Sequence, residues 1–378
     1  MIIPSALFAI ALSGAALAGE PTGFEAATPS AGANTPTVSS IINGEDATID
    51  DYPMAGGMMM DADLQFGGNA MEIRMFVCSS TLIAPDVVLL AAHCLDDYAF
   101  TYGFGTIDNK DIRWTRQADL SAHDGSAVNE WPSDAIVAWD WVVHESWDIQ
   151  KLQTGLATNY DVALIFLDQA VTDVPHAYVI TEEEAAQLAV GTELAVVGWG
   201  QQVASDSPFD APEPGTYAYK QQGMSAIAEI SDAEFKVGEL ETDVRKCHGD
   251  SGGPSFAWVE TDLKESMRIV GVTSHAYDQT DCKETGGVDT RVDFYLGWID
   301  AEMRARCEDG TRVWCDEPGL VPVPAKEPED DGGEDIDGDD EEEKGGLFTC
   351  STSTAPASRG LGMLAALGLA GLMVRRRR

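Results

Sequence analysis

A serine in a glycine-rich turn is the residue of this chain whose surroundings point most directly to chemistry. Positions 249–254 read Gly-Asp-Ser-Gly-Gly-Pro, with Ser251 at the centre. A serine hydroxyl is a weak nucleophile at neutral pH, so it needs a base that takes its proton as it attacks a carbonyl carbon. His93, in Ala-Ala-His-Cys, is the candidate base, and Asp161, just before Val-Ala-Leu-Ile, is its candidate partner. Together the three residues predict acyl transfer.

Each group has a role that fits its chemistry. Imidazole titrates near neutrality, so His93 can accept the serine proton and later donate it to a leaving amine, provided that Asp161 holds its tautomer and orientation. The reaction places negative charge on the former carbonyl oxygen. We expect the backbone N–H groups of Gly249 and Ser251 to form the oxyanion hole that binds this charge. Glycine at 249 lets the backbone approach without a Cβ atom.

Each of the three residues also has an ordinary structural explanation. A serine in a glycine-rich segment is usually part of a turn, a histidine beside a cysteine is usually a packing residue, and an aspartate before an apolar strand is usually a solvated strand end. The three occur together, however, in the chain order His, Asp, Ser. That combination favours catalysis.

The elements that must position these residues are short apolar strands between Gly, Asp and Pro turns. The clearest are Val87–Leu90, Val162–Leu167 and Leu194–Val197. Long helical periodicity is scarce in this part of the chain. The pattern therefore predicts an all-β domain.

Motifs and chain order together resemble those of the trypsin-like (chymotrypsin-family) serine proteases, from about Ile41 to Cys307. The segments 197–200 and 287–292 resemble the start and the last strand of the family's second barrel, and Phe294–Met303 resembles its closing helix. The resemblance implies two packed six-stranded antiparallel β-barrels with a C-terminal helix. It also implies a serine endopeptidase that works through an acyl-enzyme.

The resemblance assigns further roles. Ile41 resembles the mature N-terminus, whose freed amine forms a buried ion pair with the acid before the catalytic serine, here Asp250. Ser274 matches the residue that supports the catalytic aspartate. Because Ser40 precedes the implied cut, the activating protease would have to accept a small residue. The specificity pocket would be lined by Arg245, Ser274, Ala276 and Gly287.

Arg245 leaves two specificities open. It occupies the position at the pocket floor where trypsin-like enzymes carry an aspartate. A guanidinium there could bind an acidic substrate side chain, since its fork of donors matches a carboxylate. Alternatively, Asp281 or Asp289 neutralises Arg245, or it turns to solvent, which leaves a pocket for small or apolar residues because an unpaired buried charge is costly.

The seven cysteines indicate an oxidising compartment. The resemblance implies disulfides Cys78–Cys94 and Cys247–Cys282, and Cys307 and Cys315, after the closing helix, are expected to pair with each other. Cys350 is left over. The other histidines show no paired metal-ligand spacing, so the sequence calls for no metal or cofactor.

The ends of the chain indicate export. Residues 1–18 read as a signal peptide and 19–40 as a short propeptide, before a protease domain over 41–315. An acidic disordered linker follows over 316–349, with twelve acidic and no basic residues between 327 and 343. Residues 350–378 resemble the Cys-containing C-terminal sorting signals of myxobacterial surface proteins. A plain transmembrane anchor is the alternative.

The formal net charge of −41 excludes nucleic acid as a partner. Expected partners are protein or peptide substrates, an activating protease and a C-terminal sorting protease, with the membrane contacted only through the C-terminal segment. The sequence thus predicts an exported, envelope-anchored serine endopeptidase made as a zymogen. The alternative is a non-catalytic binding or adhesion protein on the same scaffold. An α/β-hydrolase esterase would need the order Ser, Asp, His, which this chain lacks.

Overall fold

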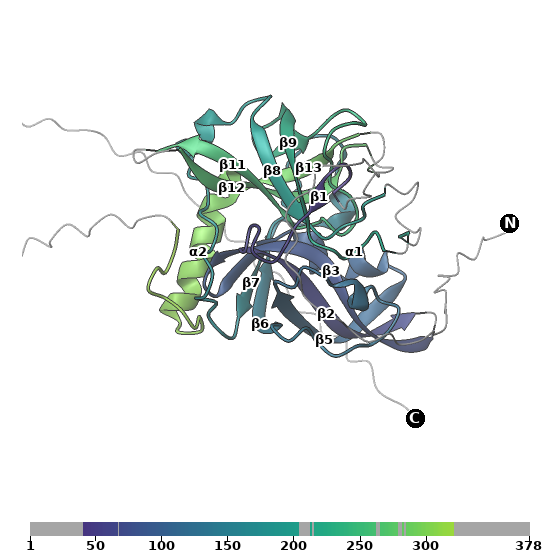
Figure 1. Cartoon of the computed structure of the whole chain (residues 1–378). Helices are drawn as coiled ribbons and strands as arrows, with labels where there is room; N and C mark the ends of the chain where they lie inside the picture. Colours follow the sequence, from purple (N-terminus) through teal and green to yellow (C-terminus); the bar gives the residue numbers. More distant parts are fainter. Residues whose placement is uncertain are drawn as a thin grey trace, which may run out of the picture. The chain divides into compact units, whose positions relative to one another are not determined.

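Two β-barrels, one after the other along the chain, make up most of the computed structural model (Figure 1). The structure describes residues 41–320 except 67, 204–211, 214, 262–264, 279–281 and 283–284. These residues all fall within one unit of the chain, Met1–Val323. The predicted signal peptide, propeptide and sorting segment with Cys350, and the linker beyond residue 320, lie outside the described residues.

Six strands close the first barrel in the order β2-β3-β4-β7-β6-β5. Strands β4 and β7 are continuous apolar runs in which every residue is buried, as expected for strands covered on both faces. The strand bounds are Ala55–Phe66 (β2), Asn69–Ala84 (β3), Val87–Leu90 (β4), Gly105–Thr115 (β5), Ile136–Val143 (β6) and Ala163–Leu167 (β7).

The second barrel has the order β9-β10-β13-β12-β11-β8 and closes through pairing of β8 with β9, while the short β1 adds to the outer edge of β9. All of these pairings are antiparallel. The bounds are Glu45–Asp46 (β1), Glu193–Gly198 (β8), Gln221–Ile230 (β9), Glu234–Val237 (β10), Pro254–Glu260 (β11), Glu265–Ala276 (β12) and Gly287–Arg291 (β13).

Helices are few and short in the described part of the chain. The α-helices are α1 (Asp97–Thr101) and α2 (Leu296–Glu308), and the 3-10 turns are η1 (Ala92–Cys94), η2 (Ser121–His123), η3 (Ile149–Lys151), η4 (Glu184–Gln187) and η5 (Asp293–Tyr295). None of the described helices has both the length and the apolar character that a membrane span needs.

The predicted fold is confirmed. The expected strand Val87–Leu90 is β4, the expected strand from Val162 begins one residue later as β7, and the closing helix runs from Leu296 to Glu308. Leu296, Ile299 and Met303 form the buried side of that helix. Near its end Arg306 lies 4.1 Å from the ring centre of Phe166, so α2 packs back onto the first barrel.

The segment after α2 is fastened to the first barrel by charge. Arg312 and Asp86 form an ion pair of 2.6 Å in which both side chains are completely buried. Asp86 lies in the turn between β3 and β4, and it also accepts a hydrogen bond from the backbone N–H of Trp314. A disulfide joins Cys307 to Cys315 around this contact.

Candidate active site

His93 and Asp161 are neighbours because of the strand register. Strands β4 and β7 are antiparallel, with Leu90 opposite Ala163. The chain therefore leaves β4 at the same end at which it enters β7. His93 follows in η1, and its ring Nδ1 lies 2.7 Å from Oδ2 of Asp161. The backbone N–H of His93 also donates to Oδ1 of Asp161, at 2.9 Å.

Asp161 is held from the second barrel as well. The Ser274 hydroxyl donates to its Oδ2 at 2.6 Å, and Thr290 Oγ1 donates to its backbone carbonyl at 3.0 Å. Burial alone would raise the pKa of Asp161, but the His93 charge and the hydrogen bonds hold it below its ordinary value. Burial opposes charge on the His93 ring, yet Asp161 raises the pKa of His93 overall.

Ser251 lies in a turn that packs against the first barrel. The Gly249 carbonyl accepts hydrogen bonds from the Ser79 hydroxyl at 2.9 Å and from the Ser79 N–H at 3.2 Å. Gly252 has φ +76°, and a Cβ atom there would clash with the Ser79 carbonyl and lie 3.2 Å from Ala91 N. Only glycine fits between this turn and the chain just before His93. The structure thus brings the predicted serine into the neighbourhood of the predicted base.

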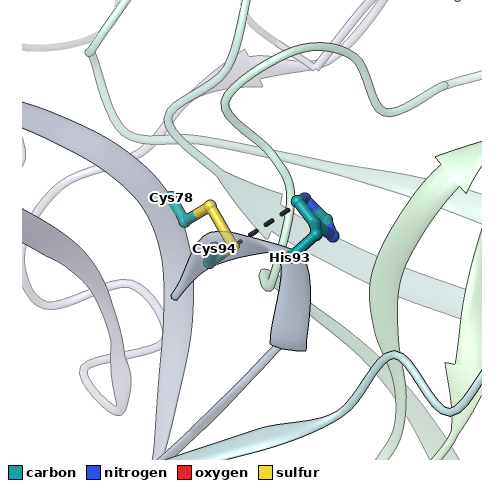
Figure 2. Close-up of side chains that lie close together, drawn as sticks. All are labelled: Cys78, His93 and Cys94. Carbon is teal, nitrogen blue, oxygen red and sulfur yellow. Dashed lines mark hydrogen bonds between the residues drawn. A yellow bond between two sulfur atoms is a disulfide. The ribbon is translucent and has the colours of Figure 1, made fainter. Parts of the chain in front are cut away.

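No hydrogen bond joins the Ser251 hydroxyl to His93, both of which lie in the described part of the chain. His93 Nε2 instead lies 3.8 Å from Cys94 Sγ (Figure 2). That sulfur is bonded to Cys78, and sulfur is only a weak hydrogen-bond acceptor. Catalytic hydrogen bonds are often long without substrate and tighten in the complex, so this arrangement is compatible with a serine–imidazole pair.

Two clusters of metal-ligand residues occur among the described residues, and each contains a disulfide. One is His93 with Cys78 and Cys94, and the other is His248 with Cys247 and Cys282. A sulfur in a disulfide cannot supply the thiolate that a metal needs. These groups therefore do not form a metal site in the oxidised protein. All three expected disulfides are present: Cys78–Cys94, Cys247–Cys282 and Cys307–Cys315.

Asp250 and Ile41 are both completely buried. The Asp250 carboxylate accepts one hydrogen bond from the Gly200 N–H and one from the Cys247 N–H, each 2.8 Å long. Burial raises the pKa of Asp250 to about 6 in spite of these bonds. In the chain as it stands, the Ile41 nitrogen is part of a peptide bond to Ser40 and carries no charge to offset the carboxylate.

The Arg245 side chain is buried and is not turned to solvent. It is 2% exposed, and its Nη2 donates to the backbone carbonyl of Glu241 at 3.2 Å. Ser274 and Ala276 lie on β12 and Gly287 on β13, where Ala276 pairs with Gly287. The predicted pocket residues are thus close in the fold. Asp281, one of the two acids considered as a partner of Arg245, lies outside the described residues.

Two buried charged residues near the site were not found from the sequence. Lys246 forms an ion pair with Asp289 of β13 at 2.8 Å. Glu234 of β10 accepts hydrogen bonds from Asn159 Nδ2 at 2.9 Å and from Ala157 N at 2.7 Å, which holds the segment that leads to Asp161. Burial raises the pKa of Glu234 to about 7. The one local signal was the basic pair 245–246 directly before the glycine-rich turn.

Two antiparallel six-stranded barrels, with a His-Asp pair from one and a Gly-Asp-Ser-Gly turn from the other, define the class of chymotrypsin-like serine proteases. The sequence model of the trypsin family matches residues 41–299, and the chain belongs to that family. It is a serine endopeptidase.

Two relatives match over nearly their whole length. A trypsin from Saccharopolyspora erythraea is 26% identical over 272 residues, which are 70% of this chain and 99% of that protein. Brachyurin from Leptuca pugilator is 26% identical over 69% of this chain and 98% of its own. A solved structure of neuropsin, a serine protease expressed in the limbic system of mouse brain, is 18% identical with a TM-score of 0.46, covering 68% of this chain and 97% of that one.

Proposed function

We propose that this protein hydrolyses peptide bonds in proteins or peptides through an acyl-enzyme, with Ser251 as nucleophile, His93 as general base and acid, and Asp161 as the group that orients His93. The carrying observation is the double contact between Asp161 and His93, through the backbone N–H and the ring Nδ1. This contact leaves Nε2 as the proton-accepting nitrogen.

The chemistry then follows from proton balance. Ser251 Oγ attacks the carbonyl carbon and gives its proton to His93 Nε2, while the imidazolium is stabilised by the Asp161 charge. When the tetrahedral intermediate collapses, the C–N bond breaks and the leaving amine takes the proton from Nε2. Water then attacks the acyl-enzyme, with His93 again accepting a proton, and Ser251 is restored.

We assign the oxyanion hole to the backbone N–H groups of Gly249 and Ser251. Gly249 has φ +95°, and a Cβ atom at this position would lie 2.8 Å from the Tyr217 ring and 2.9 Å from Gly200 Cα. The turn therefore depends on glycine here. Loss of one oxyanion donor typically lowers kcat by roughly 100- to 1000-fold.

We infer that the protein is made as a zymogen that is cut between Ser40 and Ile41. The buried carboxylate of Asp250 supports this proposal, because it accepts two backbone hydrogen bonds but has a pKa near 6. A freed Ile41 ammonium beside it would favour the charged carboxylate and would stabilise the turn that carries Ser251. A small residue at Ser40 fits an activating protease that does not require a basic residue.

Export and envelope anchoring are part of the same proposal. The three disulfides support export, because structural disulfides persist mainly in oxidising compartments. Anchoring is inferred from Cys350, the apolar run after it and the terminal arginines, with the acidic linker as a self-repelling tether. A C-terminal sorting protease would act at Cys350.

The test uses protein processed to begin at Ile41 and a diverse peptide library, read by mass spectrometry. We expect cuts that are absent from a matched Ser251→Ala preparation. An active-site-directed serine reagent should label the native chain at Ser251 in the same experiment. Identical cleavage by both proteins would contradict the proposed mechanism and favour a non-catalytic scaffold.

A further inference from the structure

One buried ion pair beside the active site has no part in the proposed mechanism. Lys246 Nζ lies 2.8 Å from Asp289 Oδ2 and 2.9 Å from the Ser255 hydroxyl. The side chains of Lys246 and Asp289 are 1% and 0% exposed. Lys246 stands five residues before Ser251, and Ser255 four residues after it, so their hydrogen bond links the two ends of the segment that carries the nucleophile.

Gly287 of β13 leaves room for a small group next to the Lys246 side chain. A Cβ atom built on Gly287 would meet only Lys246 Cβ, at 3.8 Å, and the His275 carbonyl, at 3.9 Å. His275 follows Ser274, whose hydroxyl contacts Asp161. We call this space at Gly287 the slot. It is bounded by the segment leading to Ser251 on one side and by β12 and β13 on the other.

The two bases before the glycine-rich turn, Lys246 and Arg245, both have partners among the described residues. The Lys246 ammonium is paired with Asp289, and that pair is neutral as a whole. The Arg245 guanidinium donates to the Glu241 carbonyl. Hydrogen bonds from the backbone N–H groups of Glu239 and Leu240 lower the pKa of Asp243 on the same loop, and the Arg245 charge adds to this effect. Neither base offers an unmatched charge to the slot.

We propose that the Lys246–Asp289 pair is the floor of the specificity pocket, and that this floor makes the enzyme cleave after uncharged side chains. This inference rests on the proposed function, because it concerns the residue before the bond that Ser251 attacks. A charged substrate side chain in the slot would lose water and would find the Lys246 and Asp289 charges already paired with each other, which disfavours its binding. An uncharged side chain does not pay this cost of losing the hydration of a charge.

The pair predicts opposite effects when either partner is neutralised. In Lys246→Met the Asp289 carboxylate is left without its cation, so preference should shift toward Lys or Arg before the cut. In Asp289→Asn the ammonium is left without its anion, so preference should shift toward Asp or Glu. The double variant Lys246→Met/Asp289→Asn has a neutral floor again and should prefer uncharged residues as the wild type does.

The experiment measures kcat/KM on matched peptides that differ only in having Ala, Leu, Lys or Glu before the cut. For the wild type we expect kcat/KM on the Ala and Leu peptides to exceed that on the Lys and Glu peptides at least tenfold. The ratio of Lys to Ala should rise at least tenfold in Lys246→Met, and that of Glu to Ala at least tenfold in Asp289→Asn. Thermal unfolding of each variant checks folding. If a single variant does not fold, the proposal can still be tested. The kcat/KM ratios of the wild type, the double variant and Arg245→Gln then provide the comparison.

Arg245→Gln separates this proposal from its rival. If the wild type cleaves after Glu and Arg245→Gln abolishes that preference, the floor is set by Arg245 and the proposal is overturned. A wild type that prefers Lys, or single variants that fold and keep wild-type ratios, overturns it equally. These outcomes all require Ser251-dependent cleavage, so they leave the proposed function intact. Loss of cleavage in Ser251→Ala together with uncharged preference in the wild type supports both.

Discussion

The Ser274 hydroxyl donates to Oδ2 of Asp161 at 2.6 Å, and the same oxygen lies 2.7 Å from Nδ1 of the His93 ring. Ser274 lies on β12 of the second barrel, and Asp161 lies just before β7 of the first. This carboxylate therefore ties the base to both barrels. Its orientation depends on how the two barrels are fastened together.

Removal of the Ser274 hydroxyl should slow catalysis without abolishing it. A hydrogen bond to a charged group contributes about 1.5–3 kcal/mol, so we expect Ser274→Ala to lower kcat/KM by roughly 10- to 100-fold, mostly in kcat. Ser274→Thr keeps a hydroxyl and should recover most of the activity. Steady-state kinetics on one peptide substrate measures both. Equal losses in Ala and Thr would show that packing, and not the hydrogen bond, matters at this position.

The acidic limb of the pH profile should report His93. The base must be neutral to accept the serine proton, and Asp161 raises the pKa of His93 above its ordinary value of 6.5. Activity should therefore increase with pH through a midpoint above 6.5 in plots of kcat/KM against pH.

Asp161→Asn tests the cause of that limb. It removes the charge that raises the His93 pKa, so the midpoint should move to lower pH, and kcat should fall by about 10⁴-fold because the tautomer is lost. Ser251→Ala supplies the background rate. A midpoint that stays in place would mean that another group titrates.

The uncut chain should lose stability as Asp250 ionises. Burial raises the pKa of Asp250 from 3.8 to about 6, so the folded state binds a proton that the unfolded state has released between these values. The contribution of this group to the free energy of unfolding is then highest at and below pH 3.8 and is lost as pH rises to about 6. The loss amounts to roughly 3 kcal/mol.

Urea unfolding of uncut Ser251→Ala protein across this pH range measures that loss. The matched control is Ser251→Ala/Asp250→Asn, which has no carboxylate to ionise. The difference in unfolding free energy between the two proteins should favour the asparagine variant increasingly as pH rises. A difference independent of pH would contradict the linkage.

Arg312 is predicted to be essential for stability although it lies far from the catalytic chemistry in the chain. Arg312→Met leaves the Asp86 carboxylate buried without its cation, and breaking a buried pair in this way typically costs about 3–5 kcal/mol. Replacing both residues, in Arg312→Met/Asp86→Leu, should be much less harmful. Chemical unfolding of the three proteins gives the comparison. Full stability in the single variant would exclude a structural role for the pair.

Short apolar runs between turns were enough to predict strands such as β4 and β7 from the sequence. Val87–Leu90 is a strand because four apolar residues between turns can be covered on both faces, and β7 is predicted for the same reason. The supporting role of Ser274 came from the resemblance, and its hydrogen bond to Asp161 agrees with that role.

The pairing of Lys246 with Asp289 could not be predicted in this way. The two residues are 43 positions apart in the sequence, and neither local pattern shows that an ammonium and a carboxylate will meet. Arg245 shows the same limit, because its position in the motif gives no information on its side-chain conformation. Glu234 and Asn159 also meet across 75 positions. Such contacts depend on how the barrels pack.

The contact between Arg312 and Asp86 would have a mechanical consequence if the protein is held by its C-terminus, as proposed. A pull on the chain beyond Leu320 would act first on the hydrogen bond from the Leu320 N–H to Asp300 of α2. It would then act on the segment that a disulfide joins to Cys307 and that Arg312 ties to Asp86. The Arg312–Asp86 pair would pass part of such a force to the turn between β3 and β4. If the enzyme is anchored as proposed, this ion pair would help to hold the C-terminal end of the domain against the first barrel under load.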